Sequence, residues 1–192
     1  MRRVPLATLV ATTPHGLDAN HIPLVLDESR GELGTLRGHV ARTNPAWREI
    51  TAGSEVLAIF QGDDRYISPS WYPTKREHGK VVPTWNYAVV HAHGRIEWHH
   101  ETAWLRELVE TLTDLHERDS AQPWRVADAP PAFVEGMLQR IVGFEIPIAA
   151  LDGKWKVSQN RTAVERAAVV AELRARGDAV SLAMAELIAG TS

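Results

Sequence analysis

Polar side chains that can hold an anion gather at three places along this 192-residue chain. They are the runs 38–44 (GHVARTN), 66–86 and 156–161 (KVSQNR). Each run combines basic side chains with hydroxyl or amide groups, which donate hydrogen bonds to phosphates and read the edges of heterocycles. These three runs are therefore the candidate binding sites of the chain.

The first run places Arg42, Thr43 and Asn44 at the entrance to a predicted helix. Free backbone N–H groups and the positive end of the helix dipole suit a phosphate at such a position. An ordinary helix cap by Asn44, beside a surface arginine, explains the same residues. The sequence leaves both interpretations open.

The third run offers a similar choice. Lys156, Ser158 and Arg161 can donate hydrogen bonds to an anion, and Gln159 and Asn160 can read the edge of a heterocycle. A solvated helix start, in which none of these side chains binds a ligand, is the alternative.

The middle run is rich in aromatic residues. Four of them could form a wall for a flat ring: Trp71, Tyr72, Trp85 and Tyr87. Thr84 and Asn86 would supply polar contacts beside that wall. Packing of the same rings in the core is the alternative, since aromatic residues near a barrel wall usually pack.

Histidines provide a further hypothesis. His91 and His93 lie two apart on a predicted strand and would project to the same face, which is a workable spacing for a metal. The sequence identifies no third ligand, and histidines with ordinary protein or solvent partners are the simpler interpretation. A haem-binding protein, with His39, His91 or His93 as axial ligand, is kept as an alternative.

The composition excludes several classes of protein. The chain has no cysteine, which removes disulfides, thiolate metal sites, iron–sulfur clusters and cysteine nucleophiles. No GxGxxG, Walker, GxSxG or HExxH motif is present. A net charge of -3 with interspersed signs does not support direct DNA binding. No run approaches the roughly 18 apolar residues of a membrane span, so we expect a cytoplasmic protein.

The elements that must position these groups are mostly strands in the first half of the chain. Strands are predicted at 6–13, 21–27, 34–41, 55–61 and 85–98, the last broken near Gly94, with a short helix at 46–52. Residues 66–83 hold three prolines and a glycine and are expected to form a folded loop.

The second half is mainly helical. Helical spacing appears at 104–117, 131–140, 162–176 and 179–189, and a hairpin is predicted with 142–150 and 154–157 around a turn at Asp152 and Gly153. Short strands with outer helices indicate an α+β fold, a small β-barrel with peripheral helices, in a single domain over 1–192 whose C-terminal helices begin at about 162.

Residues 66–73 (YISPSWYP), Lys75 and residues 79–87 (GKVVPTWNY) resemble the central motif of the PaiB family. Further landmarks agree in order: 36–44 (LRGHVARTN), Pro123 and Trp124, 141–146 (IVGFEI) and 154–161 (KWKVSQNR). The resemblance covers the chain up to about residue 175.

This resemblance implies an FMN-binding split β-barrel related to pyridoxamine-phosphate oxidase, assembled as a homodimer, with a role as a negative transcriptional regulator or redox sensor. Within it, His39, Arg42, Asn44, Lys80, Lys156, Ser158, Gln159, Asn160 and Arg161 are candidate cofactor contacts, and Thr84, Trp85 and Asn86 are expected near the flavin ring. An FMN-dependent oxidoreductase resembling flavin reductases is the alternative, since the flavin itself performs the redox chemistry.

Overall fold

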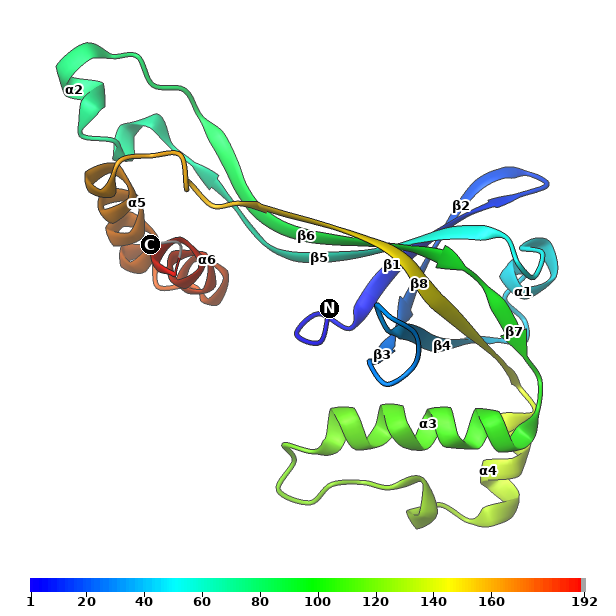
Figure 1. Cartoon of the computed structure of the whole chain (residues 1–192). Helices are drawn as coiled ribbons and strands as arrows, with labels where there is room; N and C mark the ends of the chain where they lie inside the picture. Colours follow the sequence, from blue (N-terminus) through cyan, green and yellow to red (C-terminus); the bar gives the residue numbers. More distant parts are fainter. Residues whose placement is uncertain (191–192) are drawn as a thin grey trace. The chain divides into compact units, whose positions relative to one another are not determined.

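The computed structural model describes residues 1–190 (Figure 1). Contacts divide the chain into two compact units. Unit 1 comprises Met1–Phe60 and His91–Asp152, and unit 2 comprises Gln61–Val90 and the chain from Gly153 onward. The single domain expected over 1–192 stays a prediction.

The strands form one eight-stranded sheet in the described chain. Their order is β2-β1-β5-β6-β8-β4-β3, and β7 pairs with β8. Their bounds are β1 Leu6–Thr13, β2 Gly16–Pro23, β3 Val25–Asp27, β4 Thr35–Ala41, β5 Glu55–Ile67, β6 Thr84–Arg95, β7 Glu97–His99 and β8 Ile141–Lys156. Strand β1 pairs antiparallel with β2 and β5, and β8 pairs antiparallel with β4 and β7.

The helices lie between and after these strands. They are α1 Ala46–Glu49, α2 Thr74–His78, α3 Thr102–Glu117, α4 Pro131–Leu138, α5 Ala163–Arg176 and α6 Ala179–Ala189, with the 3-10 turns η1 Pro69–Trp71 and η2 Val126–Asp128. An antiparallel sheet with peripheral helices confirms the fold class predicted from the sequence.

The predicted hairpin around Asp152 and Gly153 is wrong, because β8 runs through both residues as one 16-residue strand. Gly153 does not have the positive φ that a tight hairpin turn usually requires. Smaller differences concern bounds: the strand predicted at 21–27 is divided between β2 and β3, β5 continues to Ile67, and α1 ends at Glu49 rather than near residue 52.

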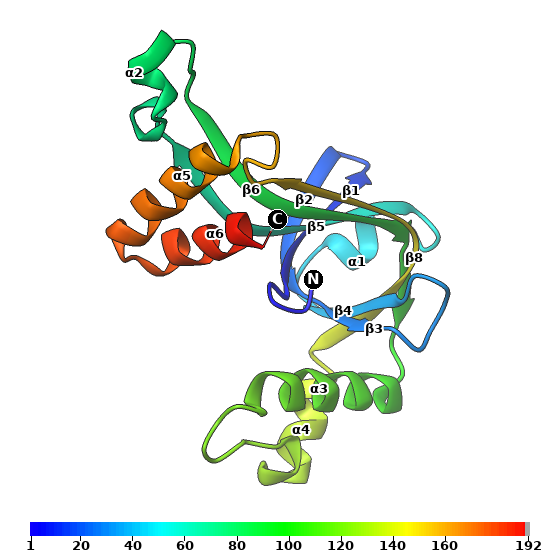
Figure 2. The ribbon, with the colours of Figure 1, turned by 60° about the vertical axis from the view of Figure 1, so that its left-hand side comes forward.

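In unit 1 the amphipathic helix α3 covers part of the sheet. Its residues Leu105, Leu108 and Leu112 are buried and follow one helical face. Leu105 packs in a cluster with residues of η2 and α4, and Leu108 and Leu112 pack against Val25 of β3. Figure 2 shows the curved strands of this unit with α3 and α4 outside them.

The side chain of Trp104 packs α3 against the sheet. Its ring stacks on His99 at a centroid distance of 4.2 Å, and the Arg37 guanidinium lies 4.8 Å from the ring centroid. The ring edge rests on Gly143 of β8, where an added Cβ would lie 2.2 Å from a Trp104 ring carbon. Glycine at position 143 is therefore required by close packing rather than by backbone conformation.

In unit 2 the helices α5 and α6 pack on an apolar cluster formed with the end of β5 and with the residues that directly follow η1 and β8. The cluster comprises Ile67, Tyr72, Val157, Val169, Leu173, Met184, Ala185 and Ile188. Gly177 ends α5 in the left-handed conformation, and Asp178 caps α6 by accepting from the Ser181 backbone N–H at 3.0 Å. Hydrogen bonds from Ser181 and then Arg65 lower the pKa of Asp178 to about 2, so the cap is charged at neutral pH.

The close approach at Gly143 yields a stability prediction. Gly143→Ala should lower the free energy of unfolding by roughly 1–3 kcal/mol, because the new methyl group must displace Trp104 from a packed core. Gly136→Ala in α4 is the matched control, since nothing lies within 4 Å of its added Cβ, and it should be neutral or stabilising. Urea unfolding of both variants measures this. Equal stability of the two would contradict the packing described for Trp104.

Candidate anion-binding site

The turn that follows β8 has an unusual backbone. Ser158 is buried and has φ of 61°, in the left-handed region that a residue with a side chain seldom adopts. The Arg161 backbone N–H donates to the Ser158 carbonyl at 2.9 Å, and the Val157 N–H donates to Oε1 of Gln159 at 2.8 Å. This tight turn places Asn160 and Arg161 immediately before α5.

Strand β6 lies beside the turn and is joined to it by two side-chain hydrogen bonds. Nδ2 of buried Asn86 donates to Oγ of Ser158 at 2.9 Å. Nζ of Lys156 donates to Oγ1 of Thr84 at 2.8 Å. Thr84 and Asn86 are two residues apart and so share one face of β6, which explains why both reach the same turn.

These residues line a cavity of about 130 Å³ in unit 2. Its walls are Tyr72, Val82, Pro83, Thr84, Asn86, Lys156, Ser158, Asn160 and Arg161. The described lining therefore contains two cations, hydroxyl groups and amides, but no carboxylate. Such a set is suited to a compact anion, which Lys and Arg attract and hydroxyl and amide groups orient.

Arg161 is positioned by two further groups of unit 2. Its guanidinium lies 4.7 Å from the centroid of the Tyr72 ring, and Nη1 lies 3.9 Å from Oε1 of buried Glu165. Burial alone would raise the pKa of Glu165, but hydrogen bonds from Thr74 and Thr162 and the charge of Arg161 outweigh burial and lower it. Glu165 is therefore ionised at neutral pH, and its negative charge attracts the Arg161 guanidinium.

The sequence analysis overlooked Glu165. The spacing of Thr162 and Glu165 is that of a capping box, and the structure contains this box at the start of α5. The spacing could have indicated the cap, but it carries no information about the contact between Glu165 and Arg161.

The cavity fits one end of a flavin mononucleotide. A volume of about 130 Å³ is well below the roughly 300–1,000 Å³ typical of pockets that enclose a whole ligand, so the cavity suits one part of the cofactor rather than all of it. A phosphate is compact and matches the donor set. Tyr72 adds a buried hydroxyl that has no hydrogen-bond partner among the described residues. The residues present thus suit the phosphate end of the cofactor.

Some predicted contacts of unit 2 lie outside the cavity lining. Trp85 faces the other side of β6 from Thr84 and Asn86, is 53% exposed, and meets Tyr66 edge to face. Lys80 is exposed after α2. Gln159 uses its side chain inside the turn, between the Val157 N–H and the Trp155 carbonyl.

The predicted contacts of the first run all belong to unit 1. Arg42 donates through Nε to the Gln139 carbonyl at 2.9 Å and through Nη2 to the Ile141 carbonyl at 3.1 Å. Asn44 accepts from the Ala46 backbone N–H at 2.8 Å, which is a helix-entry role. Burial lowers the pKa of His39, whose Nδ1 is buried without a partner in the described chain.

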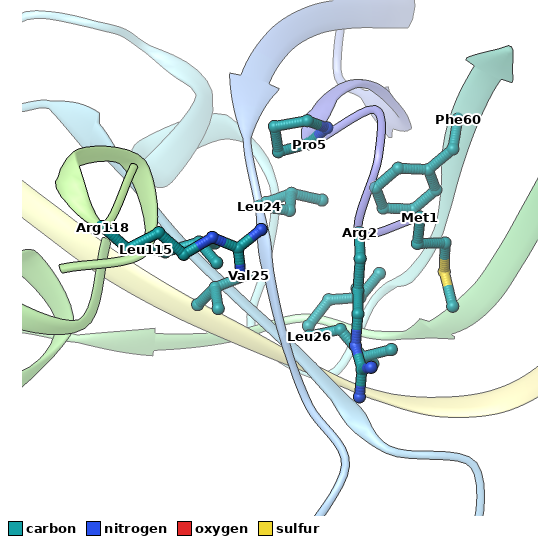
Figure 3. Close-up of a pocket in the computed structure, with 10 residues that line it drawn as sticks. Met1, Arg2, Pro5, Leu24, Val25, Leu26, Phe60, Leu115 and Arg118 are labelled. Carbon is teal, nitrogen blue, oxygen red and sulfur yellow. The ribbon is translucent and has the colours of Figure 1, made fainter. Parts of the chain in front are cut away.

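Unit 1 has a cavity of its own, of about 150 Å³ (Figure 3). Its walls are mainly apolar side chains such as Leu24, Leu36 and Phe60. Two arginines border it, but Arg2 pairs with Glu28, and Nε of Arg118 lies 3.5 Å from Oδ2 of Asp119. This cavity has a different chemical character from the polar, cationic cavity of unit 2.

Within residues 1–190 the structure has neither a metal-binding group of side chains nor a helix that could cross a membrane. No three or more His, Cys, Asp or Glu side chains in this range are grouped so as to hold a metal ion. Within the same range, no helix has both the length and the apolar character needed to cross a membrane.

Solved structures of other proteins share this fold. A protein described as an FAD- and heme-binding protein from Mycobacterium smegmatis superposes with a TM-score of 0.56, covering 81% of this chain and 67% of that one at 17% identity. The flavocytochrome Anf3 from Azotobacter vinelandii gives a TM-score of 0.55, covering 79% and 62% at 12% identity. At such low identity these likenesses bear on the fold alone. The chain shares its fold with these two proteins, which confirms the split β-barrel predicted from the sequence.

The family follows from closer matches. Residues 1–150 match the family model described as "Putative FMN-binding domain". The Bacillus subtilis protein named protease synthase and sporulation protein PAI 2 is 34% identical over 180 residues, which cover 93% of this chain and 84% of that protein. An uncharacterised protein of Emericella nidulans is 33% identical over 90% of this chain and 81% of its own length. The chain therefore belongs to the PaiB-type FMN-binding family, and its cofactor is FMN.

The buried pair Asn86 and Ser158 provides a test of the site geometry in the flavin-free protein. Asn86→Ala should lower the free energy of unfolding by about 1–3 kcal/mol, because it removes a buried hydrogen bond that holds the turn. The same change should cost clearly less in a Ser158→Ala background, where the acceptor is already gone. Urea unfolding of the four proteins measures the coupling. Equal costs in the two backgrounds would show that the pair does not interact.

Proposed function

We propose that this chain is a redox-sensing regulatory flavoprotein that holds the phosphate of FMN in the cavity of unit 2. The observation that carries the placement is the convergence of Lys156 and Arg161 with Ser158 and Asn86 on a cavity of phosphate size. We further propose that it works as a homodimer, which light scattering would distinguish from a monomer by mass.

Within this proposal the protein residues bind and orient, and bound FMN supplies the redox chemistry by accepting and releasing electrons. Lys156 contributes a point charge and Arg161 a planar set of donors, a combination that suits the several oxygens of a phosphate. The Asn86 hydrogen bond fixes the orientation of the Ser158 hydroxyl before any ligand arrives. Because these donors are already oriented, ordering them costs little free energy when the anion binds.

The regulatory part of the proposal draws on the relatives. The Bacillus subtilis relative carries a name that refers to protease synthesis and sporulation, and the match extends over most of both chains. The sequence does not support direct DNA binding, since its net charge is -3. A regulator of this composition would act through a protein partner or a ligand, with the redox state of the flavin as its input.

The phosphate placement makes a prediction about ligand selectivity. Lys156→Gln and Arg161→Gln should each weaken FMN binding by about tenfold or more, because each removes one charged contact to the phosphate. Riboflavin, which lacks the phosphate, should bind the wild type and both variants alike. Quenching of flavin fluorescence on titration measures each Kd.

Arg174→Gln is the matched control for these variants. It removes the same charge in the same unit, but Arg174 lies in the last turn of α5, where it pairs with Glu186. Its affinity for FMN should equal that of the wild type. Unchanged FMN affinity in both Lys156→Gln and Arg161→Gln would refute the placement of the phosphate.

A sensor and an oxidoreductase differ in turnover. The FMN-loaded protein, mixed with NADH or NADPH in air, should show no sustained oxidation of the nicotinamide, although the bound flavin should be reducible by dithionite and reoxidised by air. Absorbance at the nicotinamide band follows the reaction. Sustained oxidation that depends on bound FMN would replace the sensor with the alternative of an FMN-dependent oxidoreductase.

A further inference from the structure

Tyr72 is the one residue of the cavity lining whose ring is fully packed while its polar atom lacks a hydrogen-bond partner within residues 1–190. The residue is 2% exposed, and its ring belongs to the apolar cluster beneath α5 and α6. A buried hydroxyl without a partner costs free energy, and most such groups in proteins are satisfied. Phenylalanine would fill the same space without this cost, so the oxygen calls for another explanation.

The surroundings of Tyr72 indicate what the hydroxyl is for. The residue borders the cavity together with Lys156, Ser158 and Arg161. The Arg161 guanidinium lies over the Tyr72 ring and is therefore held beside the cavity. A ligand in the cavity that pairs with Arg161 therefore lies near the Tyr72 side chain. The two cations also determine the charge of that ligand, since they attract an anion.

We propose that the Tyr72 hydroxyl is a phosphate-binding group that donates a hydrogen bond to a phosphate oxygen of bound FMN. This inference rests on the proposed function and adds a residue that selects flavins carrying a phosphate over those without one. A phenol O–H can donate to an anionic oxygen and gives a charge-assisted hydrogen bond, which is stronger than one between neutral groups.

Glu165 helps to hold Arg161 in this position. It accepts from Thr74 Oγ1 at 2.9 Å and lies 3.9 Å from Nη1 of Arg161, so it restrains the guanidinium. Arg161 and Tyr72 thus form a preset pair, in which the cation attracts the phosphate and the hydroxyl completes its hydrogen bonds.

The test is Tyr72→Phe, which removes one oxygen and leaves the packing ring. The variant should bind FMN about tenfold more weakly, because a hydrogen bond to a charged group is lost. It should bind riboflavin like the wild type. Without flavin its thermal unfolding temperature should be unchanged or raised, because an unsatisfied buried oxygen has been removed. Weaker binding without loss of stability is not expected of a purely structural tyrosine.

Tyr87→Phe is the matched control. Tyr87 is half-buried in the same unit and lies next to Asn86 on β6, so its side chain points to the opposite face. Any change that it makes near the flavin ring should affect FMN and riboflavin equally, so the ratio of their affinities should stay that of the wild type.

The outcomes separate this inference from the proposed function. If Tyr72→Phe binds FMN like the wild type while Lys156→Gln and Arg161→Gln bind it weakly, the role of Tyr72 is overturned and the phosphate placement stands. Equal loss of FMN and riboflavin affinity in Tyr72→Phe, or a marked fall in unfolding temperature, also overturns it. If all three variants bind FMN normally, the phosphate placement fails as well.

Discussion

The hydrogen bond from Asn86 to Ser158 is the interaction on which the rest of the site depends. It joins β6 to the turn after β8 through two buried side chains, 72 positions apart in sequence. Ser158 adopts a left-handed backbone conformation that is unfavourable for a residue with a side chain, so the surrounding contacts must hold it there. From this fixed turn the chain continues to Arg161 and then into α5. A change in the turn would therefore move the guanidinium relative to Lys156.

Unit 2 separates the tasks of packing and binding within a few residues. The apolar cluster under α5 and α6 forms the base of the site. Polar side chains next to this cluster line the cavity. Tyr72 belongs to both parts, and Glu165 holds Arg161 from the helix side. Rigid support of this kind matters for a small cofactor end, because donors that are already oriented lose little entropy on binding.

Many strands and helices could be predicted because the residues that specify each one lie within or next to it in the sequence. The strand 6–13 and the helix 179–189 have the predicted bounds, since alternation and a flanking Gly-Asp pair mark them clearly. The hairpin at Asp152 and Gly153 was wrong because a turn-forming pair does not exclude a continuous strand when neighbouring strands pair with it. The grouping of Thr84 and Asn86 with the run 156–161 depends on which strands become neighbours.

Some predicted site residues lie outside the cavity for the same reason: which side chains come together depends on elements that are far apart in the sequence. Their position at the entrance to a predicted helix suggested Arg42 and Asn44 as phosphate contacts, but both make local contacts in unit 1, to backbone carbonyls and to the start of α1. Local patterns could not reveal that the Tyr72 hydroxyl lacks a partner, because that depends on every group that surrounds it.

The measurement that tests the central claim most directly is a crystal structure of this chain with FMN. It should show the phosphate between Lys156 and Arg161 in the cavity of unit 2. Phosphate density beside Arg42 and Asn44 instead would contradict the account.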